Sequence, residues 1–561
     1  MLKALFSIFL VFWVVEITAQ GTYFKNRMEY IPNDIALNYG IIPISTGGYL
    51  TFGSHEMQAN FDRYGAVIKI DELGNGVDTL RFRYDTIQTE IVSMFEINNS
   101  YYAITRYWTN VPPLFYTSLV KINQNLDTVW SKKMDYGFDT SVFVSYAMLT
   151  RDSAIAISGI FTDTNGYQSI LLLKIDTLGN EIFFKSYGYT NEHQFNYWNM
   201  DQTLDGGFIL AGASTFFHPM GAGYEKHIAI KTDSLGNQEW IHPFGRNDND
   251  NGGCKVKALR DSTILIYANT PTNASPTPVY DWSFRKVSYA NQLIWNNQYG
   301  PYHEYNVTND IVELEDSSLV AHRLIYLRSH ITKLDKNANI IWDRFNKPTV
   351  SSFMGLPMVF VPSDSGFVYS GFIQPQLSLG DTGTQDIFII KTNCIGWADP
   401  PFADATTGSL DNFEVVLDNN SIYFGNCFID WGDGNLDTLY ESSDTLIYHT
   451  YSSDGIFNAT IIAEACGDKD TLNLNVVSSL VGVAEHEKRI FRIFPNPTNE
   501  ILHIQLDELN IDFDVILSDI TGKIILQDRN ALTIDVSDFS TGIYFITIPQ
   551  LNSTEKIQVL R

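Results

Sequence analysis

The sequence predicts an all-β protein built largely from one repeated unit. Hydrophobic residues make up 44% of the 561 residues and aromatic residues 14%, while charged residues are only 18%. Tyr, Phe, Thr, Asn, Gly and Ile are abundant, which is typical of strands and turns. A hydrophobic run that ends in a lysine and a polar turn also recurs seven times before residue 396. Composition and repeat together favour the all-β class.

Residues 1–19 are predicted to be a secretory signal peptide. Lys3 supplies the positive start, residues 4–15 form an apolar run, and a cleavage point follows Ala19. Such a run is too short for a spanning helix, and no later segment is apolar enough to be a transmembrane segment. We therefore expect export. The balance of 64 acidic against 37 basic residues, a net charge of −27, argues against a nucleic-acid partner.

The repeat has two signatures, a turn such as "LDGGFILAG" and, further on, a strand and turn such as "IAIKTDSLGN". Its copies lie roughly fifty residues apart, a spacing that indicates a solenoid or a propeller. One copy reads as four short strands at 195–203, 207–214, 227–233 and 238–244. A four-stranded antiparallel unit of this size is typical of a propeller blade, since β-helix coils are shorter. We predict a seven-bladed β-propeller over residues 21–396. The aligned lysines are Lys69, Lys121, Lys174, Lys231, Lys286, Lys333 and Lys391.

The chain lacks an outgoing strand after Lys391, whereas residues 22–30 precede the first blade as a spare segment. We expect this segment to supply the missing outer strand of the seventh blade. The aligned lysines are expected to lay their stems on packed surfaces and to pair with nearby acids. The pattern resembles the Kelch-like or quinoprotein-like repeats of secreted Bacteroidota proteins, which implies a fold but no activity.

Residues 398–478 leave the repeat. They contain "WGDG" at 431–434 and "HTY" at 449–451, followed by a strand at 456–463. This stretch resembles a PKD domain, so a first Ig-like β-sandwich is implied, with a spacer or adhesive role.

A linker is predicted at 479–489, and the last 72 residues, 490–561, carry four strand-like runs. They resemble the type A C-terminal sorting domain of the type IX secretion system of Bacteroidota, which implies a second Ig-like sandwich. The resemblance further implies the type IX machinery as a partner, passage across the outer membrane, removal of the domain, and a secreted or cell-surface location. The matching motif residues are Pro495, Asn496, Pro497, Gly522, Gly542 and Tyr544.

The chemistry-bearing residues form no recognisable catalytic or metal set. The sequence has no G-x-S-x-G, H-E-x-x-H or P-loop motif, so we expect no enzyme, and no cofactor or metal is predicted. The acidic segments 246–253 and 430–437 fit turns, with a calcium loop as the alternative. Cys427 and Cys466 fall in one predicted domain, where a disulfide or two buried thiols are both possible.

Aromatic residues gather in four segments that we predict to be loops, at 106–117, 187–198, 214–226 and 299–305. Flat rings on loops suit sugars or peptides, although they can also fold back and pack. The candidate ligand-binding residues are Tyr107, Trp108, Phe115, Tyr116, Tyr189, Phe216, Phe217, Tyr224 and Tyr302.

These observations predict an exported propeller protein that binds an extracellular glycan or protein through aromatic loops. One alternative is a polysaccharide-active enzyme with its carboxylates in the propeller channel, and another is a purely structural surface protein. Two or more carboxylates that line the channel within about 5–10 Å of each other would favour the enzyme, whereas a channel lined by small and aliphatic groups would exclude it.

Overall fold

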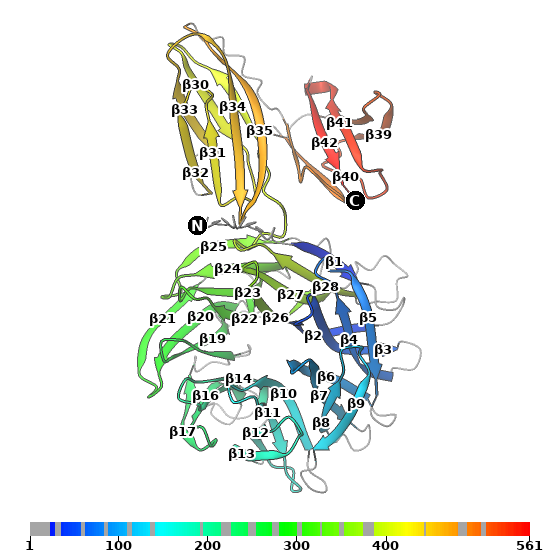
Figure 1. The fold of residues 1–561 in the computed structure, drawn as a ribbon, viewed down its shortest axis with the longest axis vertical. Helices are drawn as coiled ribbons and strands as arrows, with labels where there is room; N and C mark the ends of the chain where they lie inside the picture. Colours follow the sequence, from blue (N-terminus) through cyan, green and yellow to red (C-terminus); the bar gives the residue numbers. More distant parts are fainter. Residues whose placement is uncertain are drawn as a thin grey trace, which may run out of the picture.

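The structure is a computed structural model, shown in Figure 1. The residues that it describes are 23–28, 35–57, 62–83, 88–108, 115–134, 141–190, 195–214, 226–244, 254–271, 280–299, 306–325, 328–346, 353–373, 386–441, 445–480, 491–506, 512–551 and 553–560. They form an all-β fold in which the one helical element described is the short 3-10 turn η1 (Pro549–Leu551). Within these ranges, no helix has the length and apolar character needed to cross a bilayer. The predicted signal peptide and the acidic segment 246–253 lie outside the described residues.

The strands between Phe24 and Thr392 form seven four-stranded antiparallel sheets. The first sheet contains β2 (Ile35–Pro43), β3 (Tyr49–Met57), β4 (Asp62–Ile70) and β5 (Gly76–Phe82). The second contains β6 (Gln88–Ile97), β7 (Ser100–Trp108), β8 (Phe115–Ile122) and β9 (Thr128–Met134). The third contains β10 (Ser141–Leu149), β11 (Ile155–Thr162), β12 (Gln168–Ile175) and β13 (Glu181–Thr190). The fourth contains β14 (Phe195–Gln202), β15 (Phe208–Ser214), β16 (Lys226–Thr232) and β17 (Gln238–Phe244).

The remaining sheets follow the same order with one exception. The fifth contains β18 (Cys254–Ala258), β19 (Thr263–Pro271), β20 (Tyr280–Ser288) and β21 (Leu293–Tyr299). The sixth contains β22 (Asn306–Glu313), β23 (Leu319–Ile325), β24 (Arg328–Leu334) and β25 (Ile340–Phe345). The seventh contains β26 (Phe353–Val361), β27 (Gly366–Ile373) and β28 (Asp386–Thr392), and its fourth strand is β1 (Phe24–Met28). The pairing of β1 with β28 is the one expected for residues 22–30.

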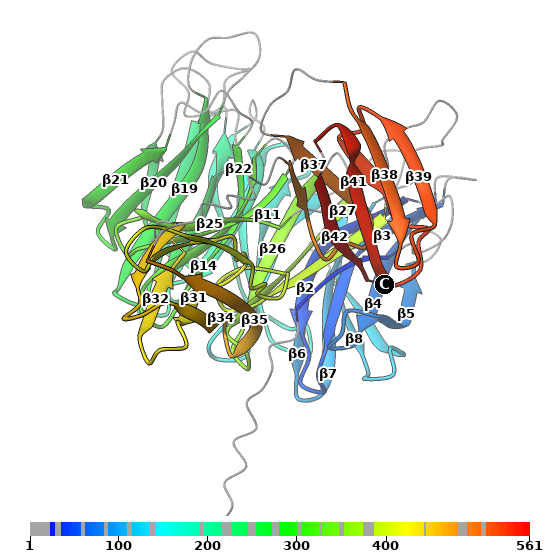
Figure 2. The same cartoon turned by 90° about the horizontal axis from the view of Figure 1, so that it is seen from above.

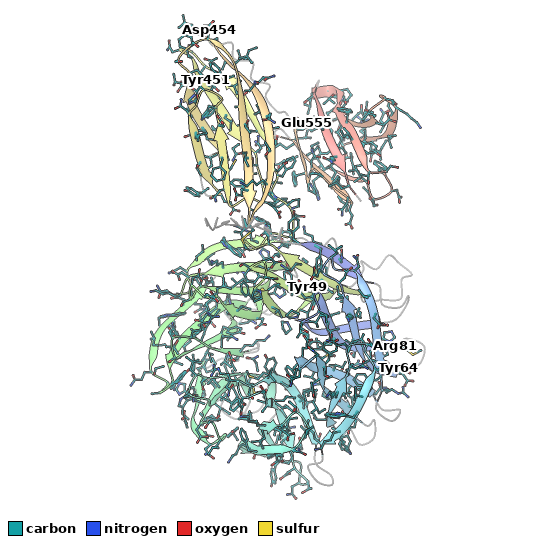
Figure 3. All side chains as sticks on the ribbon, viewed as in Figure 1. Tyr49, Tyr64, Arg81, Tyr451, Asp454 and Glu555 are labelled. Carbon is teal, nitrogen blue, oxygen red and sulfur yellow. A yellow bond between two sulfur atoms is a disulfide. The ribbon has the colours of Figure 1, made fainter. Side chains whose placement is uncertain are left out.

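Neighbouring sheets share hydrophobic clusters. Ile104 of the second sheet and Ile155 of the third belong to one such cluster, for example. The seventh and first sheets are joined in the same way, because Val368 and Ile389 cluster with Ile41. Figure 1 shows the sheets side by side around a common centre, with β2, β6, β10, β14, β22 and β26 nearest to it. Side chains fill the spaces between the sheets, as at Tyr49 in Figure 3.

The turn after the third strand is fixed by an aspartate or asparagine side chain in six sheets and by the Ser288 hydroxyl in the fifth. Asp233 Oδ1 accepts hydrogen bonds from the backbone N–H groups of Leu235 at 2.9 Å and Asn237 at 2.7 Å. These bonds, led by the one from the Asn237 side chain, lower the pKa of Asp233. Gly236 completes the turn with a φ of 75°, a left-handed conformation that costs glycine little. The "DSLGN" signature is thus a hairpin device, and its recurrence reflects the recurrence of the hairpin.

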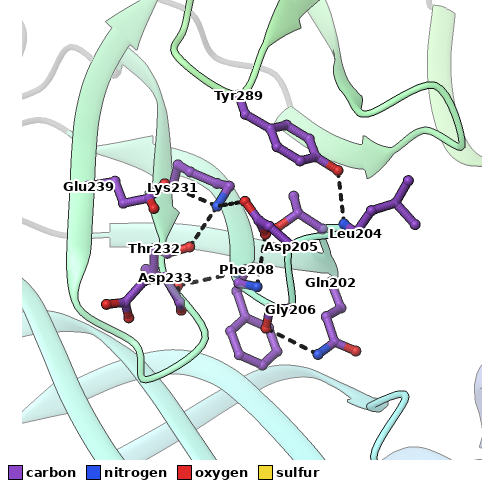
Figure 4. Close-up of polar contacts among 12 residues, drawn as sticks. Gln202, Leu204, Asp205, Gly206, Phe208, Lys231, Thr232, Asp233, Glu239 and Tyr289 are labelled. Carbon is purple, nitrogen blue, oxygen red and sulfur yellow. Dashed lines mark hydrogen bonds and ion pairs between the residues drawn. The ribbon is translucent and has the colours of Figure 1, made fainter.

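The two signatures of the repeat meet as an ion pair. In the fourth sheet, Lys231 is fully buried, and its Nζ lies 2.9 Å from Asp205 and 3.1 Å from Glu239 (Figure 4). Burial opposes ionisation of Asp205, but hydrogen bonds from Thr203, Lys231 and a backbone N–H leave its pKa lowered. The predicted pairing of the repeat lysines with nearby acids is confirmed in five sheets. The other four pairs are Lys174–Asp152, Lys286–Asp261, Lys333–Asp316 and Lys391–Asp364.

In the two sheets whose repeat lysine is 0% exposed, a glycine stands two positions after the aspartate that pairs with the lysine. A Cβ on Gly207 would lie 2.8 Å from Lys231 Nζ, and one on Gly366 would lie 2.3 Å from Lys391 Nζ. Both lysines are 0% exposed, whereas Lys333, whose turn has a serine there, is 22% exposed. The turn sequences "DGG" and "DSG" therefore leave space for a buried lysine ammonium group.

The middle sandwich, residues 405–478, packs two sheets around Trp431, Ile461 and their neighbours. One sheet contains β29 (Ala405–Ser409), β30 (Glu414–Asn419) and β33 (Leu446–Thr450). The other contains β31 (Asn426–Asp430), β32 (Leu436–Tyr440), β34 (Gly455–Ala465) and β35 (Asp468–Ser478). Trp431 Nε1 donates to Asp437, and Tyr451 Oη donates to the carbonyl of Trp431, so the "WGDG" and "HTY" motifs buttress each other.

The C-terminal sandwich has a separate core around Leu517 and Ile546. One sheet contains β36 (Phe491–Phe494), β37 (Ile501–Leu506) and β40 (Thr533–Asp535). The other contains β38 (Asp514–Asp519), β39 (Ile524–Arg529), β41 (Gly542–Ile548) and β42 (Ser553–Val559). Figure 2 shows the two sandwiches apart from each other, in front of the seven sheets in that view.

The disulfide considered possible between Cys427 and Cys466 does not form. Cys466 bonds to Cys394, 72 positions away, while Cys427 is a buried thiol that contacts Asn419 and Ser421. The reason is geometric: Cys427 points into the core of the sandwich, whereas Cys466 lies in the turn after β34, next to the turn that follows β28. The bond therefore ties the seventh sheet to the middle sandwich.

The other contacts at this junction centre on Arg344 of β25. Its guanidinium lies over the rings of Trp342 at 5.0 Å and Trp397 at 4.9 Å and forms an ion pair with Glu441 of the middle sandwich. Burial is the main cause of a lowered Arg344 pKa, which the Glu441 carboxylate opposes. The junction is thus held by the Cys394–Cys466 disulfide and by the Arg344 guanidinium, which stacks on two tryptophan rings.

Replacing both Cys394 and Cys466 by serine is expected to destabilise the protein by about 2–4 kcal/mol, since the bridge closes a long loop of the unfolded chain. Urea unfolding of the wild type with and without reductant measures this, and reductant should leave the double variant unaffected. An identical wild-type midpoint in both conditions would show that the bridge does not stabilise the fold.

Candidate functional site

The aromatic residues predicted at 106–117 belong to strand ends rather than to a solvent-facing loop. Tyr107 and Trp108 end β7, and Phe115 and Tyr116 begin β8. Tyr107 is 1% exposed and stacks on Tyr116 at 5.5 Å, and Trp108 packs against Phe115. The prediction that these rings face solvent is therefore wrong for Tyr107, because antiparallel pairing of the two strands packs the rings on each other.

The other predicted ligand-binding residues cannot be placed as a group. Tyr189 is in β13, and only its backbone is described. The remaining four, Phe216, Phe217, Tyr224 and Tyr302, lie outside the described residues.

Next to the packed aromatic residues, one buried carboxylate is held by two arginines. Glu90 of β6 is 2% exposed, and its two oxygens lie 2.5 Å from Arg63 and 2.5 Å from Arg106. Burial opposes ionisation, but Arg106 and then Arg63 leave the pKa of Glu90 lowered. Arg106 also lies 4.0 Å over the Phe143 ring. All the polar groups of this triad have partners, so it stabilises the packing of the first three sheets.

The first strands nearest the centre carry a repeated irregularity. In six of the seven sheets, the register of the first strand shifts part-way along the strand, as between Thr308 and Asp310 of β22. Such β-bulges re-aim side chains and are common beside functional sites. The first strands of the third to sixth sheets carry a set of polar residues that we name the central cluster: Tyr146, Asp201, Lys255, Lys257 and Asp310.

Asp201 of β14 is the anchored acid of the central cluster. It accepts the N–H groups of Gln202 at 2.8 Å and Ala258 at 3.0 Å, and Lys257 Nζ lies 3.0 Å away. The same carboxylate thus ties β14 to β18 and holds a cation. The Asp201 carboxylate raises the pKa of Lys257 despite burial, so this lysine stays charged.

Asp310 of β22 differs from Asp201 although it is tied to the next sheet in the same way. It accepts the N–H groups of Ile311 at 2.9 Å and Met358 at 3.2 Å. Burial raises the pKa of Asp310, against the pull of Lys255 and Lys257, while burial lowers the pKa of Lys255. Burial of the Asp310 carboxyl group therefore favours its protonated form.

Tyr146 of β10 completes the central cluster. Its pKa is raised, first by burial and then by Asp310, and Asp201 adds to the effect. Asp201 and Asp310 thus act on the same phenol, as they do on Lys257. The cluster brings one phenol, two ammonium groups and two carboxyl groups together from β10, β14, β18 and β22.

The central cluster offers hydrogen-bond donors and acceptors at half-buried positions. Lys257 is 35% exposed and Asp201 16% exposed, so each retains contact with solvent. Interleaved ammonium and carboxylate groups can bind a ligand whose groups both donate and accept, as hydroxyl groups do. Among the described residues, no group of three or more His, Cys, Asp or Glu side chains could hold a metal ion.

Sequence reasoning missed the central cluster because its members are single polar residues in unremarkable strands. A usable signal existed, since Asp201, Lys257 and Asp310 each stand a few positions before the turn aspartate of their repeat. Alignment of the repeats on that turn, rather than on the lysine, sets Asp201 and Lys257 in one column, four positions before the turn aspartate, and Asp310 in another, six positions before it.

A pocket of about 240 Å³ lies at the junction with the middle sandwich and includes Trp397, Tyr423 and Glu441 in its lining. Two of its polar side chains already have partners in the protein. Glu441 pairs with Arg344, and Ser421 Oγ donates to the carbonyl of Asp404. We assign it to the packing of the junction.

The predicted sorting-motif residues have definite positions in the C-terminal sandwich. Asn496 donates to the carbonyl of Lys556 and accepts the N–H of Gln558, both at 2.8 Å, so the Pro495–Pro497 turn is bound to β42. Gly522 has a φ of 81° in the turn between β38 and β39. Gly542 begins β41, and Tyr544 Oη donates to the carbonyl of Ser540.

Comparison with known proteins agrees with this placement. Residues 492–560 match the family described as the secretion system C-terminal sorting domain. No curated protein matches the chain.

Several solved structures are similar to part of the chain. A protein of unknown function from Bacteroides caccae is 10% identical with a TM-score of 0.32, over 50% of this chain and 87% of that one. An α-L-arabinanase of Penicillium chrysogenum complexed with arabinobiose is 9% identical with a TM-score of 0.35, over 53% and 91%. A protein of unknown function from Dyadobacter fermentans is 8% identical with a TM-score of 0.37, over 64% and 99%. Likenesses at these TM-scores carry no argument about fold or function. The match at 492–560 supports a substrate of type IX secretion that reaches the cell surface or the medium.

Proposed function

We propose that this chain is an exported glycan-binding protein whose first 28 strands form a closed seven-bladed propeller. The pairing of β1 with β28 and the cluster that joins Ile41 to Val368 support ring closure. A following PKD-like sandwich, covalently tied to the propeller by Cys394–Cys466, would carry it as a spacer. The predicted signal peptide and the sorting domain give the route of export.

The observation that carries the binding function is the convergence of the central cluster on the strands nearest the centre. Buried or half-buried charges are costly, and packing alone does not require five polar groups from four sheets at one place. The cluster combines two acids with two lysines, so it does not select a strongly charged ligand. Neutral sugars, whose hydroxyl groups donate and accept, fit this set of groups.

The expected result of replacing Lys257 by Met is a loss of glycan affinity of about tenfold or more, which corresponds to ~1.4 kcal/mol. The reason is the loss of a half-buried charged donor that the Asp201 carboxylate holds in position. A glycan array with the wild-type protein identifies the ligand, and titration of that ligand measures both proteins. Lys133→Met is the matched control, because Lys133 lies on the outer strand β9. Equal affinity of the wild type and the Lys257 variant, or no glycan bound across a broad array, would refute the proposal.

A second candidate, a polysaccharide-active enzyme, is favoured by the contrast between Asp310 and Asp201. A carboxyl group with a raised pKa beside one held by a lysine is the pattern of a general acid and its partner. Incubating the protein with the glycans that bind on the array, and measuring the reducing ends released, distinguishes hydrolysis from binding alone. Hydrolysis that Asp310→Asn abolishes would establish the enzyme, while binding without hydrolysis would leave the binding protein.

A further inference from the structure

One face of the C-terminal sandwich is apolar although it lies on the surface. In the sheet β39–β38–β41–β42, Ile520 is 72% exposed, Ile524 54% and Ile543 40%. Ser518 of β38 pairs with Ile524 on one side and with Phe545 on the other. Asp519 pairs with Tyr544, and the residues next to this pair, Ile520 and Ile543, therefore lie beside each other. Ile520, Ile524, Ile543 and Phe545 therefore adjoin each other, and we name them the tail patch.

The tail patch is not part of the hydrophobic core. The core side chains of the same strands, such as Leu517 and Ile546, alternate with patch residues and point toward the opposite sheet. The exposed fractions are those in the whole chain, so neither the seven sheets nor the middle sandwich covers the patch. Contiguous exposed apolar residues on a soluble domain mark an interaction surface.

The tail patch coincides with the motifs of the sorting domain. Gly522 shapes the hairpin that carries Ile520 and Ile524, and Gly542 precedes Ile543 directly. A family motif that only stabilised the fold would not need to end at an exposed apolar surface. The matched family is a sorting domain of a secretion system, so the partner that must bind this domain is a component of that system.

We propose that the tail patch is the surface through which the type IX secretion machinery binds this protein. Lys556 is exposed and pairs with Phe545 across β41 and β42, so a cation borders the patch. The Asp519 carboxylate is already used, because it accepts the N–H groups of Thr521 and Lys523. The partner surface is therefore apolar with an acidic border.

The test is export of full-length variants in a type IX-competent host. Ile524→Thr with Ile543→Thr removes apolar surface while keeping β-branched residues that suit strands. We expect most of this double variant to stay inside the cell. The matched control is Ile501→Thr with Leu532→Thr, since these residues of the same domain are 39% and 45% exposed, Ile501 lies in β37 of the other sheet, and Leu532 directly precedes β40 of that sheet. It should be exported as the wild type is.

Thermal melting of each purified full chain checks that the domain remains folded. Lys556→Glu is the second variant, because an exposed charge change leaves the core intact, and it too should be retained. Export of the patch variants at wild-type levels would overturn the proposal, as would equal retention of the control. Deletion of residues 490–561 separates this failure from a wrong export route: if the deletion variant is exported normally, the route itself is wrong.

Discussion

Deleting residues 490–561 is expected to abolish delivery to the cell surface while leaving the rest of the protein folded. The C-terminal sandwich has its own hydrophobic core, formed by residues between Phe491 and Val559, so its removal exposes no core of the other sheets. The match at 492–560 identifies this part as the sorting signal. The measurement is the distribution of the protein between periplasm, cell surface and medium in a type IX-competent host. We expect the truncated protein to accumulate in the periplasm.

The reciprocal experiment is a gain of export. Fusing residues 479–561 to an unrelated protein that reaches the periplasm should carry it to the surface, because the sorting domain folds around its own core. Mature surface material is expected to end between Ser478 and about residue 490, since exposed linkers are favoured cleavage sites. Normal amounts of the truncated protein outside the cell would contradict the assignment.

Replacing Asp364 by Ala is expected to destabilise the protein by about 3–5 kcal/mol, because it leaves a buried lysine without its acid. Lys391 is 0% exposed, and its Nζ lies 2.7 Å from Asp364, which is itself 11% exposed. Lys391 Nζ also donates a hydrogen bond to the carbonyl of Thr392 at 3.0 Å. Urea unfolding followed by tryptophan fluorescence measures the change.

The chain supplies its own matched control in Asp316→Ala. Asp316 occupies the same place in the sixth sheet and accepts the N–H of Ser318, as Asp364 accepts that of Gly366. Asp316 is 60% exposed, and its lysine lies 3.4 Å away. Because the Lys333–Asp316 pair is exposed to solvent, its loss should lower the stability by only about 1 kcal/mol or less. Both variants also lose the hydrogen bond that the aspartate accepts from the turn N–H group. The difference between the variants thus isolates the buried charge.

The pH dependence of the Asp364 variant gives a second readout. Burial already lowers the pKa of Lys391 below its ordinary 10.5, and Asp364 opposes this. Without Asp364 the folded-state pKa falls further, so the unfolded chain binds more protons than the folded one in the window below 10.5. The stability deficit should shrink as pH rises through that window. Adding Lys391→Met should also recover stability, and equal losses for Asp364→Ala and Asp316→Ala would refute the argument.

The sequence by itself determined the all-β class, the repeated unit and the sorting domain. These follow from local chemistry. The turn "DSLGN" closes a hairpin through Asp233 and Gly236 wherever it occurs, and alternation of apolar residues defines the strands on each side. The predicted strands at 195–203 and 238–244 therefore lie within a residue of the observed β14 and β17. The sorting domain was recognisable because its motif residues occur in order within one short segment.

Only the tertiary structure decided which residues meet across the repeats. Cys466 pairs with Cys394 rather than Cys427 because the turn after β34 lies against the turn after β28, a proximity that no local pattern encodes. Tyr107 packs inward because β7 and β8 extend further than their sequence suggested. Asp201 and Asp310 come from sheets separated by a third, yet both act on Lys257 because the first strands face one centre. Local interactions fix strands and turns, whereas a site assembled from several sheets depends on long-range packing that single-residue patterns leave open.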